Sequence, residues 1–163
     1  IGLIQHLLLK IFKKKRQTQN IDLYNNFIKN IPTLTPKTKR DATIDSSFQR
    51  MNEMFFFNQM EQPNVQWGKA SFRKLASYNF HNDTITVSTL FKEARQEVLD
   101  YLVYHEMLHK HHKFKSKNGR SSFHSPAFKR DEAKYPYYQK IEKEIEDIVR
   151  AKRPKKKSFW DFL

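Results

Sequence analysis

The residues best suited to chemistry are His105-Glu106-Met107-Leu108-His109, an H-E-x-x-H motif. Two histidines four positions apart project from one face of a helix, where they can share a metal ion. Neutral imidazoles suit zinc, and a glutamate that follows the first histidine can act as general base toward water at the metal. The motif therefore predicts a zinc site with His105 and His109 as ligands and Glu106 as the base.

A third ligand is expected further along the chain, because a catalytic zinc usually has three protein ligands and one open position. His111 falls on a different face of the helix. His112 lies on the same rigid helix, which does not readily wrap three ligands around one ion. His124 follows His109 by fifteen residues, beyond a loop and just before another helix, so a second element could close the site. His124 is our preferred third ligand and Glu132 is the alternative.

The motif requires a helix, and residues 92–112 satisfy this requirement. This stretch has no glycine or proline and shows a wide apolar face, so we expect a long and largely buried helix. Short strands are predicted upstream over 65–67, 72–80 and 84–88, and the last of these alternates polar and apolar residues. We expect the three strands to form a small antiparallel sheet.

Further helices are predicted on both sides of these elements. Apolar spacing predicts helices over 21–31 and 43–60, and a charged amphipathic helix over 137–150. Ser125 and Pro126 predict the start of another helix, with the serine as N-cap and the proline at the first helical position. The expected fold class is α+β, with an N-terminal helix, a three-stranded sheet, the central motif-bearing helix and C-terminal helices.

The net charge of +14 arises from 31 lysines and arginines against 17 acidic residues. Basic blocks at 13–16 and 150–157 together contain ten positive residues and no acidic one. We therefore divide the chain into a basic helical arm over 1–40, a compact domain over 41–150 and a basic tail with an aromatic terminus over 151–163. Such blocks attract polyanions, nucleic acid first and anionic membrane second, or are simply solvated ends.

The candidate nucleic-acid contacts are basic residues of these blocks and of the loop over 110–120, which also contains Lys110. The loop could equally be an ordinary solvated one. The candidates are Lys13, Lys14, Lys15, Arg16, Lys113, Lys115, Lys117, Arg120, Lys155, Lys156 and Lys157.

The composition excludes several classes of site. The absence of cysteine excludes disulfides, thiolate zinc sites, iron–sulfur clusters and a cysteine nucleophile. None of the three glycines stands in a phosphate-binding pattern. No run reaches the roughly 18–20 apolar residues of a membrane span. We expect a cytoplasmic protein, associated with a nucleoid or chromatin if the basic blocks bind DNA.

Several segments resemble, in the same order, the SprT-like metalloprotease family, which includes the DNA–protein crosslink protease spartan. They are Trp67, Ala76-Ser77-Tyr78, the strand over 84–88, the H-E-x-x-H motif and Phe123-His124-Ser125-Pro126-Ala127-Phe128. The resemblance covers roughly residues 41–130. The two histidine-containing motifs at this spacing are its specific part.

The resemblance implies a small zincin-like metallopeptidase fold. It implies His105, His109 and His124 as zinc ligands and Glu106 as catalytic base. Small single-domain H-E-x-x-H zymogens of archaea form a neighbouring family. Many SprT-like proteins also carry a cysteine zinc ribbon, which this chain lacks. Any DNA binding would therefore fall to the basic arms and to the loop over 110–120.

The hypothesis is a zinc metallopeptidase that hydrolyses peptide bonds of proteins, including proteins bound to DNA. The strand over 84–88 is expected to line the cleft and to pair with an extended substrate. The aromatic run over 55–57 is expected in the core. The alternative is a nucleic-acid-associated zinc-binding protein, or a latent zymogen without free peptidase activity.

The end of the chain resembles a peptide that binds a sliding clamp. Phe159 precedes the pair Phe162-Leu163 by one helical turn, a spacing suited to a hydrophobic pocket. Lys156 stands where such peptides usually have glutamine. The alternative is that Phe159 and Trp160 pack on the chain's own body, or over the cleft as a plug.

Overall fold

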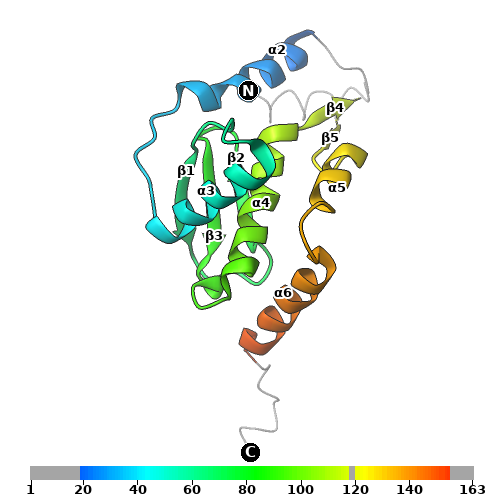
Figure 1. Cartoon of the computed structure of the whole chain (residues 1–163). Coiled ribbons are helices and arrows are strands. Elements are labelled where there is room, and N and C mark those ends of the chain that lie inside the picture. The colour runs from blue at the N-terminus through cyan, green and yellow to red at the C-terminus, as the bar shows by residue number, and fades with distance from the viewer. Residues whose placement is uncertain (1–18, 118–119, 155–163) are drawn as a thin grey trace, which may run out of the picture.

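The computed structural model describes residues 19–117 and 120–154. A mixed three-stranded sheet is followed by a long central helix, with further helices at both ends (Figure 1). In chain order the helices are α2 (Gln19–Asn30), α3 (Ala42–Phe56), α4 (Gln96–His112), α5 (Pro126–Glu132) and α6 (Tyr138–Lys152). The strands are β1 (Asn64–Gly68), β2 (Ala76–Asn79), β3 (Thr84–Ser88), β4 (Lys115–Lys117) and β5 (Arg120–Ser122). Two short 3₁₀ helices are η1 (Ile31–Leu34) and η2 (Thr89–Phe91). The expected α+β class is confirmed.

The main sheet has the strand order β1-β3-β2. β2 and β3 form an antiparallel hairpin, whereas β1 pairs with β3 in parallel. The prediction of an antiparallel sheet was therefore wrong for β1. The chain crosses from β1 to the far edge before β3 returns between the two, and an alternating pattern carries no information about that order.

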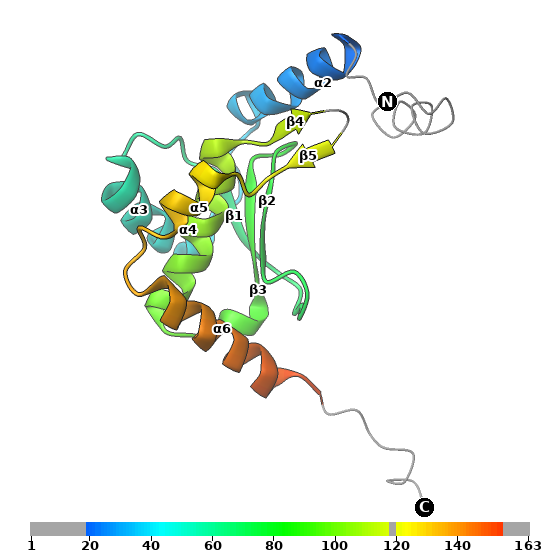
Figure 2. The same ribbon diagram turned by 90° about the vertical axis from the view of Figure 1, so that its right-hand side faces the viewer.

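One face of the sheet packs on helices α3 and α4, and none of the described helices covers the other face (Figure 2). Ile85 and Val87 of β3 point into the core, where Phe48 of α3 and Met107 of α4 are also buried. The alternate residues of β3 are polar, as in Thr86, whose hydroxyl accepts a hydrogen bond from the Gln66 side chain. The alternation predicted for this strand thus separates an apolar face in the core from a polar face, on which Thr84 and Ser88 are buried and Thr86 is half-buried.

The central helix α4 is buried around most of its circumference, as expected. Its buried apolar and aromatic residues are Val98, Leu99, Tyr101, Leu102, Val103, Tyr104, Met107 and Leu108. The helix begins later than predicted because η2 precedes it, with the Ser88 hydroxyl accepting from the Leu90 amide at 3.4 Å. Helices α5 and α6 pack against α4 on the side away from the sheet. No helix in the described ranges is long and apolar enough to cross a membrane.

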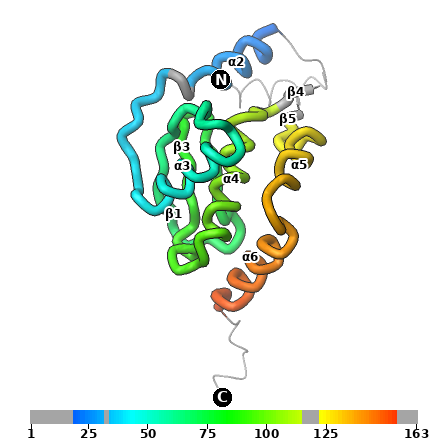
Figure 3. Tube along the Cα trace, viewed as in Figure 1, coloured from blue at the N-terminus to red at the C-terminus, as the bar shows by residue number. Residues whose placement is uncertain are grey.

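The N-terminal segment is attached to the sheet. After α2 the chain descends beside β1 to the start of α3 (Figure 3). The Lys39 carbonyl accepts from the Val65 amide at 2.9 Å, and the Asp41 amide donates to the Val65 carbonyl at 3.1 Å. The residues just before α3 therefore extend the sheet edge locally.

The aromatic run at the end of α3 is only partly in the core. Phe55 and Phe56 lie 4.3 and 6.1 Å from the ring of Tyr104. Phe57, however, is 81% exposed, because the chain turns there into a left-handed conformation with φ 53°. The core prediction was wrong for this ring.

Candidate metal centre

Three histidines converge beside the sheet. His105 and His109 lie one turn apart on α4, and His124 comes from the segment between β5 and α5. One ring nitrogen from each lies within 4.8 Å of the others. The Nε2 atoms of His105 and His124 are 3.4 Å apart. Tetrahedral zinc with bonds of about 2.0–2.1 Å separates its ligand atoms by about 3.4 Å, so this spacing fits such an ion.

A single phenylalanine orients all three rings. Phe128 is fully buried, and its ring centroid lies 5.1, 4.8 and 4.7 Å from those of His105, His109 and His124. The start of α5 places it there, because the Ser125 hydroxyl accepts from the Phe128 amide at 3.2 Å. The predicted N-cap is confirmed, and it fixes the element that follows His124.

Glu132 lies behind His105. Its Oε1 is 2.6 Å from Nδ1 of His105, which leaves the Nε2 of that ring directed at His124. Burial lowers the pKa of His105, but the carboxylates of Glu132 and Glu106 more than offset this and the net pKa is raised. A carboxylate on the distal nitrogen fixes the tautomer of a metal-binding histidine. The geometry thus places Glu132 as a partner of His105 and outside the histidine cluster.

His109 has the protonation state that a metal ligand needs. Burial, together with nearby His105 and His124, lowers its pKa to about 4, so the ring is neutral at neutral pH. Its Nδ1 is buried and, within the described part of the chain, has no hydrogen-bond partner. Three imidazoles with such spacing suit zinc among the common divalent ions. The residues present therefore fit a metal ion.

Glu106 is held against the edge of the sheet. It is 5% exposed, and the nearby backbone N–H of Tyr78 in β2 favours its ionised form. Burial raises its pKa to about 7, despite opposing contributions from His105, the Tyr78 hydrogen bond and Lys74. A general base is most effective when its pKa lies near the working pH.

A groove of about 810 Å³ runs past these residues. Its walls include the four residues of β2 on one side and Phe123 and His124 on the other, with Glu106 and His109 between them. A second cavity of about 460 Å³ lies on the other side of His105 and Glu106, bordered by Tyr101 and residues of α6. The histidine cluster is thus open to a substrate along β2.

The expectation that the strand over 84–88 pairs with substrate was wrong. That strand is β3, the centre of the sheet, and both of its edges are occupied by β1 and β2. The edge strand next to the histidines is β2, which among the described strands pairs only with β3. Alternation reports that one face of a strand packs on the core and does not distinguish a central strand from an edge strand, so the pattern could not identify β2 as the edge.

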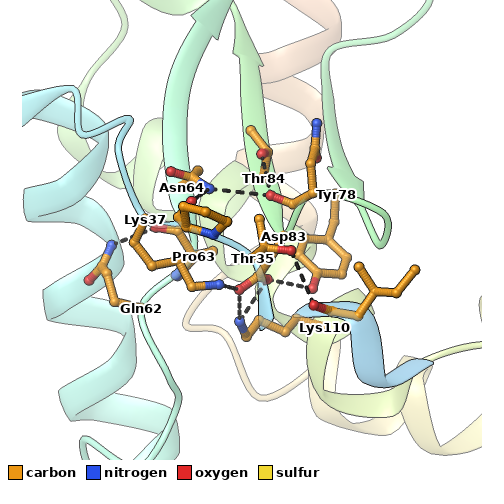
Figure 4. A network of polar contacts seen from close by, with 12 residues as sticks. Thr35, Lys37, Gln62, Pro63, Asn64, Tyr78, Asp83, Thr84 and Lys110 are labelled. Carbon is orange, nitrogen blue, oxygen red and sulfur yellow. Dashed lines mark hydrogen bonds and ion pairs between the residues drawn. The ribbon is translucent and has the colours of Figure 1, made fainter. Parts of the chain in front are cut away.

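Lys110, in the stretch considered for nucleic-acid binding, faces inward. Its Nζ lies 2.7 and 2.6 Å from the two carboxylate oxygens of Asp83. Figure 4 shows the same carboxylate bound by the Tyr78 hydroxyl at 2.6 Å and by the ammonium of Lys37. Asp83 is fully buried, so this network joins β2, α4 and the N-terminal segment. Lys110 is therefore unavailable for a phosphate.

The other basic candidates are placed only in part. Lys113 is half-buried at the end of α4, and the predicted loop after it instead contains the short hairpin β4–β5. The hairpin lies immediately before His124 in the chain. The blocks at 13–16 and 155–157 and the clamp-like residues Phe159, Phe162 and Leu163 lie outside the described residues, so these predictions stay predictions.

Three contributions to this site were not predicted from the sequence. The backbone N–H of Tyr78 holds Glu106, Phe128 orients the histidine rings, and Glu132 binds His105 instead of joining the cluster. The Tyr78 contact depends on the sheet order, which has no local signal. The position of Glu132 seven residues after the Ser125 cap places it at the end of the helix that follows His124, and this was the available clue.

Comparison with known proteins agrees with this fold. The family model described as the SprT-like family matches residues 44–146. The zymogen of the metallopeptidase jannalysin from Methanocaldococcus jannaschii is 20% identical with a TM-score of 0.49, covering 72% of this chain and 96% of that one. The abylysin zymogen from Pyrococcus abyssi is 19% identical with a TM-score of 0.51, covering 66% and 95%. No curated protein matches. The chain belongs to the SprT-like family and carries a metallopeptidase domain.

Proposed function

We propose that the chain is a zinc-dependent metallopeptidase that hydrolyses peptide bonds of protein substrates. His105, His109 and His124 are the zinc ligands in this proposal, and Glu106 is the catalytic base. The observation that carries it is the convergence of three imidazole nitrogens within 4.8 Å beside an almost fully buried carboxyl group. Membership of the SprT-like family supports the reaction class.

The role of each group in the proposed reaction follows from its surroundings. A bound zinc ion supplies Lewis acidity toward a carbonyl group and toward water. Glu106 takes a proton from the attacking water and delivers it to the leaving amine, and it lines the same groove as His105, His109 and His124. Glu132 keeps the His105 ring in one orientation, and Phe128 packs against the histidine rings from the core.

An extended peptide fits the edge of β2. Among the described strands it has a partner on one side only, and its four residues line the groove. At about 3.3 Å per residue, a strand of this length matches roughly four substrate residues. The Tyr78 N–H is already used by Glu106, which places the base directly beside the bound backbone.

The substrates that we propose include proteins held on DNA. The basic blocks at 13–16 and 150–157 account for ten positive charges of the net +14. Such clusters bind phosphates without sequence preference and would keep the enzyme near DNA-bound proteins. The chain has no cysteine for a zinc ribbon, so in this proposal the arms replace that module.

The test is cleavage of casein by purified protein with measured zinc content, with and without DNA. Wild type should contain zinc and cleave. The E106Q variant should keep its zinc and lose at least about 100-fold in rate, because an amide cannot act as base. The E53Q variant, at an exposed position on α3, is the matched control and should cleave normally. Cleavage retained in E106Q would contradict the mechanism. Zinc without cleavage by wild type, with or without DNA, would favour the alternative of a nucleic-acid-associated zinc protein or latent zymogen.

A further inference from the structure

We propose that Tyr101 is a positioning residue for the metal ligand His105 and that it acts through Glu132. The proposal rests on the metal site argued above and assigns a role to a residue that does not reach the histidine cluster itself. Tyr101 precedes His105 by one turn of α4, so both side chains lie on the same side of the helix.

The contacts form a continuous chain. Nδ1 of His105 is 2.6 Å from Oε1 of Glu132, and the Tyr101 hydroxyl lies 3.4 Å from the same oxygen. The hydroxyl has a single proton, which it shares between this oxygen and Oε1 of Glu142 in α6, 3.0 Å away. The hydroxyl thus joins three helices at a point one carboxylate away from the proposed ligand.

Tyr101 itself has little freedom to move. It is 4% exposed, and its ring packs edge-on against Tyr135 at 5.2 Å. Glu132, by contrast, ends the short helix α5 and is partly open to solvent. A long, partly exposed side chain loses rotamer freedom when it is held, so a rigid second partner reduces the cost of keeping its carboxylate on His105.

The expected consequence concerns metal affinity and turnover. If the hydroxyl is removed, Glu132 has one fixed partner fewer and holds His105 less strictly. Removal of a direct partner of a metal-binding histidine typically costs 10–100-fold in affinity or activity. Removal of a group one contact further from the metal should have a smaller effect. We therefore expect Y101F to lose about three- to tenfold in zinc affinity and in turnover.

Tyr135 provides a matched control. It is a buried tyrosine in the same aromatic cluster, and its hydroxyl donates to the Glu97 carbonyl at 2.8 Å, away from Glu132. Y135F removes a buried hydroxyl of the same kind without touching the proposed chain. A purely structural role for Tyr101 predicts the same behaviour for both variants.

The experiment measures zinc affinity by competition with a chromophoric chelator, together with thermal unfolding of the metal-free proteins. Y101F should bind zinc about three- to tenfold more weakly and lower kcat at unchanged KM, whereas Y135F should stay within about twofold of wild type. Equal zinc affinity in Y101F and wild type would overturn the proposal. The proposal would also be overturned if Y135F lost as much zinc affinity as Y101F while the two metal-free variants unfolded at the same temperature. A wild type that binds no zinc would overturn the metal site itself, so the two failures are distinguishable.

Discussion

Glu106 shows how one residue depends on burial for its chemistry. Its surroundings keep the carboxyl group away from water, and only the Tyr78 N–H and neighbouring positive groups favour the ionised form. The same burial that prepares the base therefore destabilises the folded protein when that base is ionised. A bound cation would offset this cost, so the effect belongs to the metal-free state.

The pH dependence of stability follows from this shift. The folded pKa of Glu106 is about 7 against 4.5 in the unfolded chain, so the folded state binds the proton more tightly. Its contribution is fully present below pH 4.5 and is lost as the pH rises through about 7. E106Q has no such proton. In chelator, its stability relative to wild type should increase by on the order of 3 kcal/mol between pH 4 and pH 8. Urea unfolding at both pH values measures this, and a pH-independent difference would contradict it.

His124 and Glu132 are the residues that decide the ligand set. Because the Glu132 carboxylate binds the far side of His105, we expect H124A to lose most of its zinc. E132A should bind zinc about 10–100-fold more weakly but keep the same stoichiometry at saturation. Metal analysis after dialysis checks both. Full zinc in H124A, with none in E132A, would transfer the third-ligand role to Glu132.

At the scale of the elements, the Asp83 network holds the hairpin turn, the end of α4 and the N-terminal segment together. Both oxygens of the buried carboxylate face ammonium groups. Burial lowers the pKa of Lys110, and the opposing effect of Asp83 only partly restores it. Removal of one partner from such a pair strongly destabilises the fold, because the remaining charge is left buried without a counter-charge.

A substitution in the Asp83 network should lower the free energy of unfolding far more than a substitution in a surface ion pair. D83N removes the partner of Lys110 and should lower the free energy of unfolding by about 3–5 kcal/mol. D45N removes the partner of Arg40, whose side chain is 54% exposed, and should cost at most about 1 kcal/mol. Urea unfolding of the metal-free proteins compares the two. Equal costs would show that Asp83 carries no buried charge.

The elements also show what sequence could and could not predict. The motif helix and the start of α5 were predictable because their signals are local: apolar periodicity in one and the Ser125-Pro126 cap in the other. His105 and His109 were predictable from their spacing, whereas His124 was only preferred over Glu132, partly through the resemblance to the SprT-like family. The parallel pairing of β1 and the choice of β2 as edge strand depend on contacts between distant residues. The network around Asp83 depends on the same tertiary order and had no sequence signal.

On the scale of the whole molecule, much of the net charge belongs to the chain ends. The block at 13–16 and the residues 155–157 lie outside the described ranges, and neither contains an acidic residue. Among the described residues, Lys110 of α4 and Lys37 of the segment before α3 are tied to Asp83. We therefore expect the domain to fold without the charges that we assign to DNA, and peptidase activity and DNA binding to be separable.

DNA binding should accordingly depend on salt through the arms. Each duplex phosphate neutralised contributes a log–log slope of about −0.9. Replacement of the seven positive residues at 13–16 and 155–157 by glutamine should flatten the slope by several units and leave casein cleavage without DNA unchanged. Fluorescence anisotropy over a salt series measures the slope. An unchanged slope would place any DNA binding on the domain.

The aromatic terminus is a separate question at this scale. Deletion of residues 158–163 separates clamp docking from self-packing. If the terminus packs on the chain itself, its deletion should lower thermal stability or release peptidase activity. If it docks on a clamp, the deletion should do neither and should only abolish binding to a purified sliding clamp. If the intact chain does not bind the clamp, the docking hypothesis fails.

Zinc reconstitution tests the central claim most directly. The protein is stripped with a chelator, and casein cleavage is followed as zinc is added back. We predict no cleavage in the stripped protein and recovery in proportion to added zinc up to one equivalent per chain, because one histidine cluster is found among the described residues. Full cleavage by the stripped protein, or a zinc-loaded protein in which cleavage does not follow occupancy, would contradict the account.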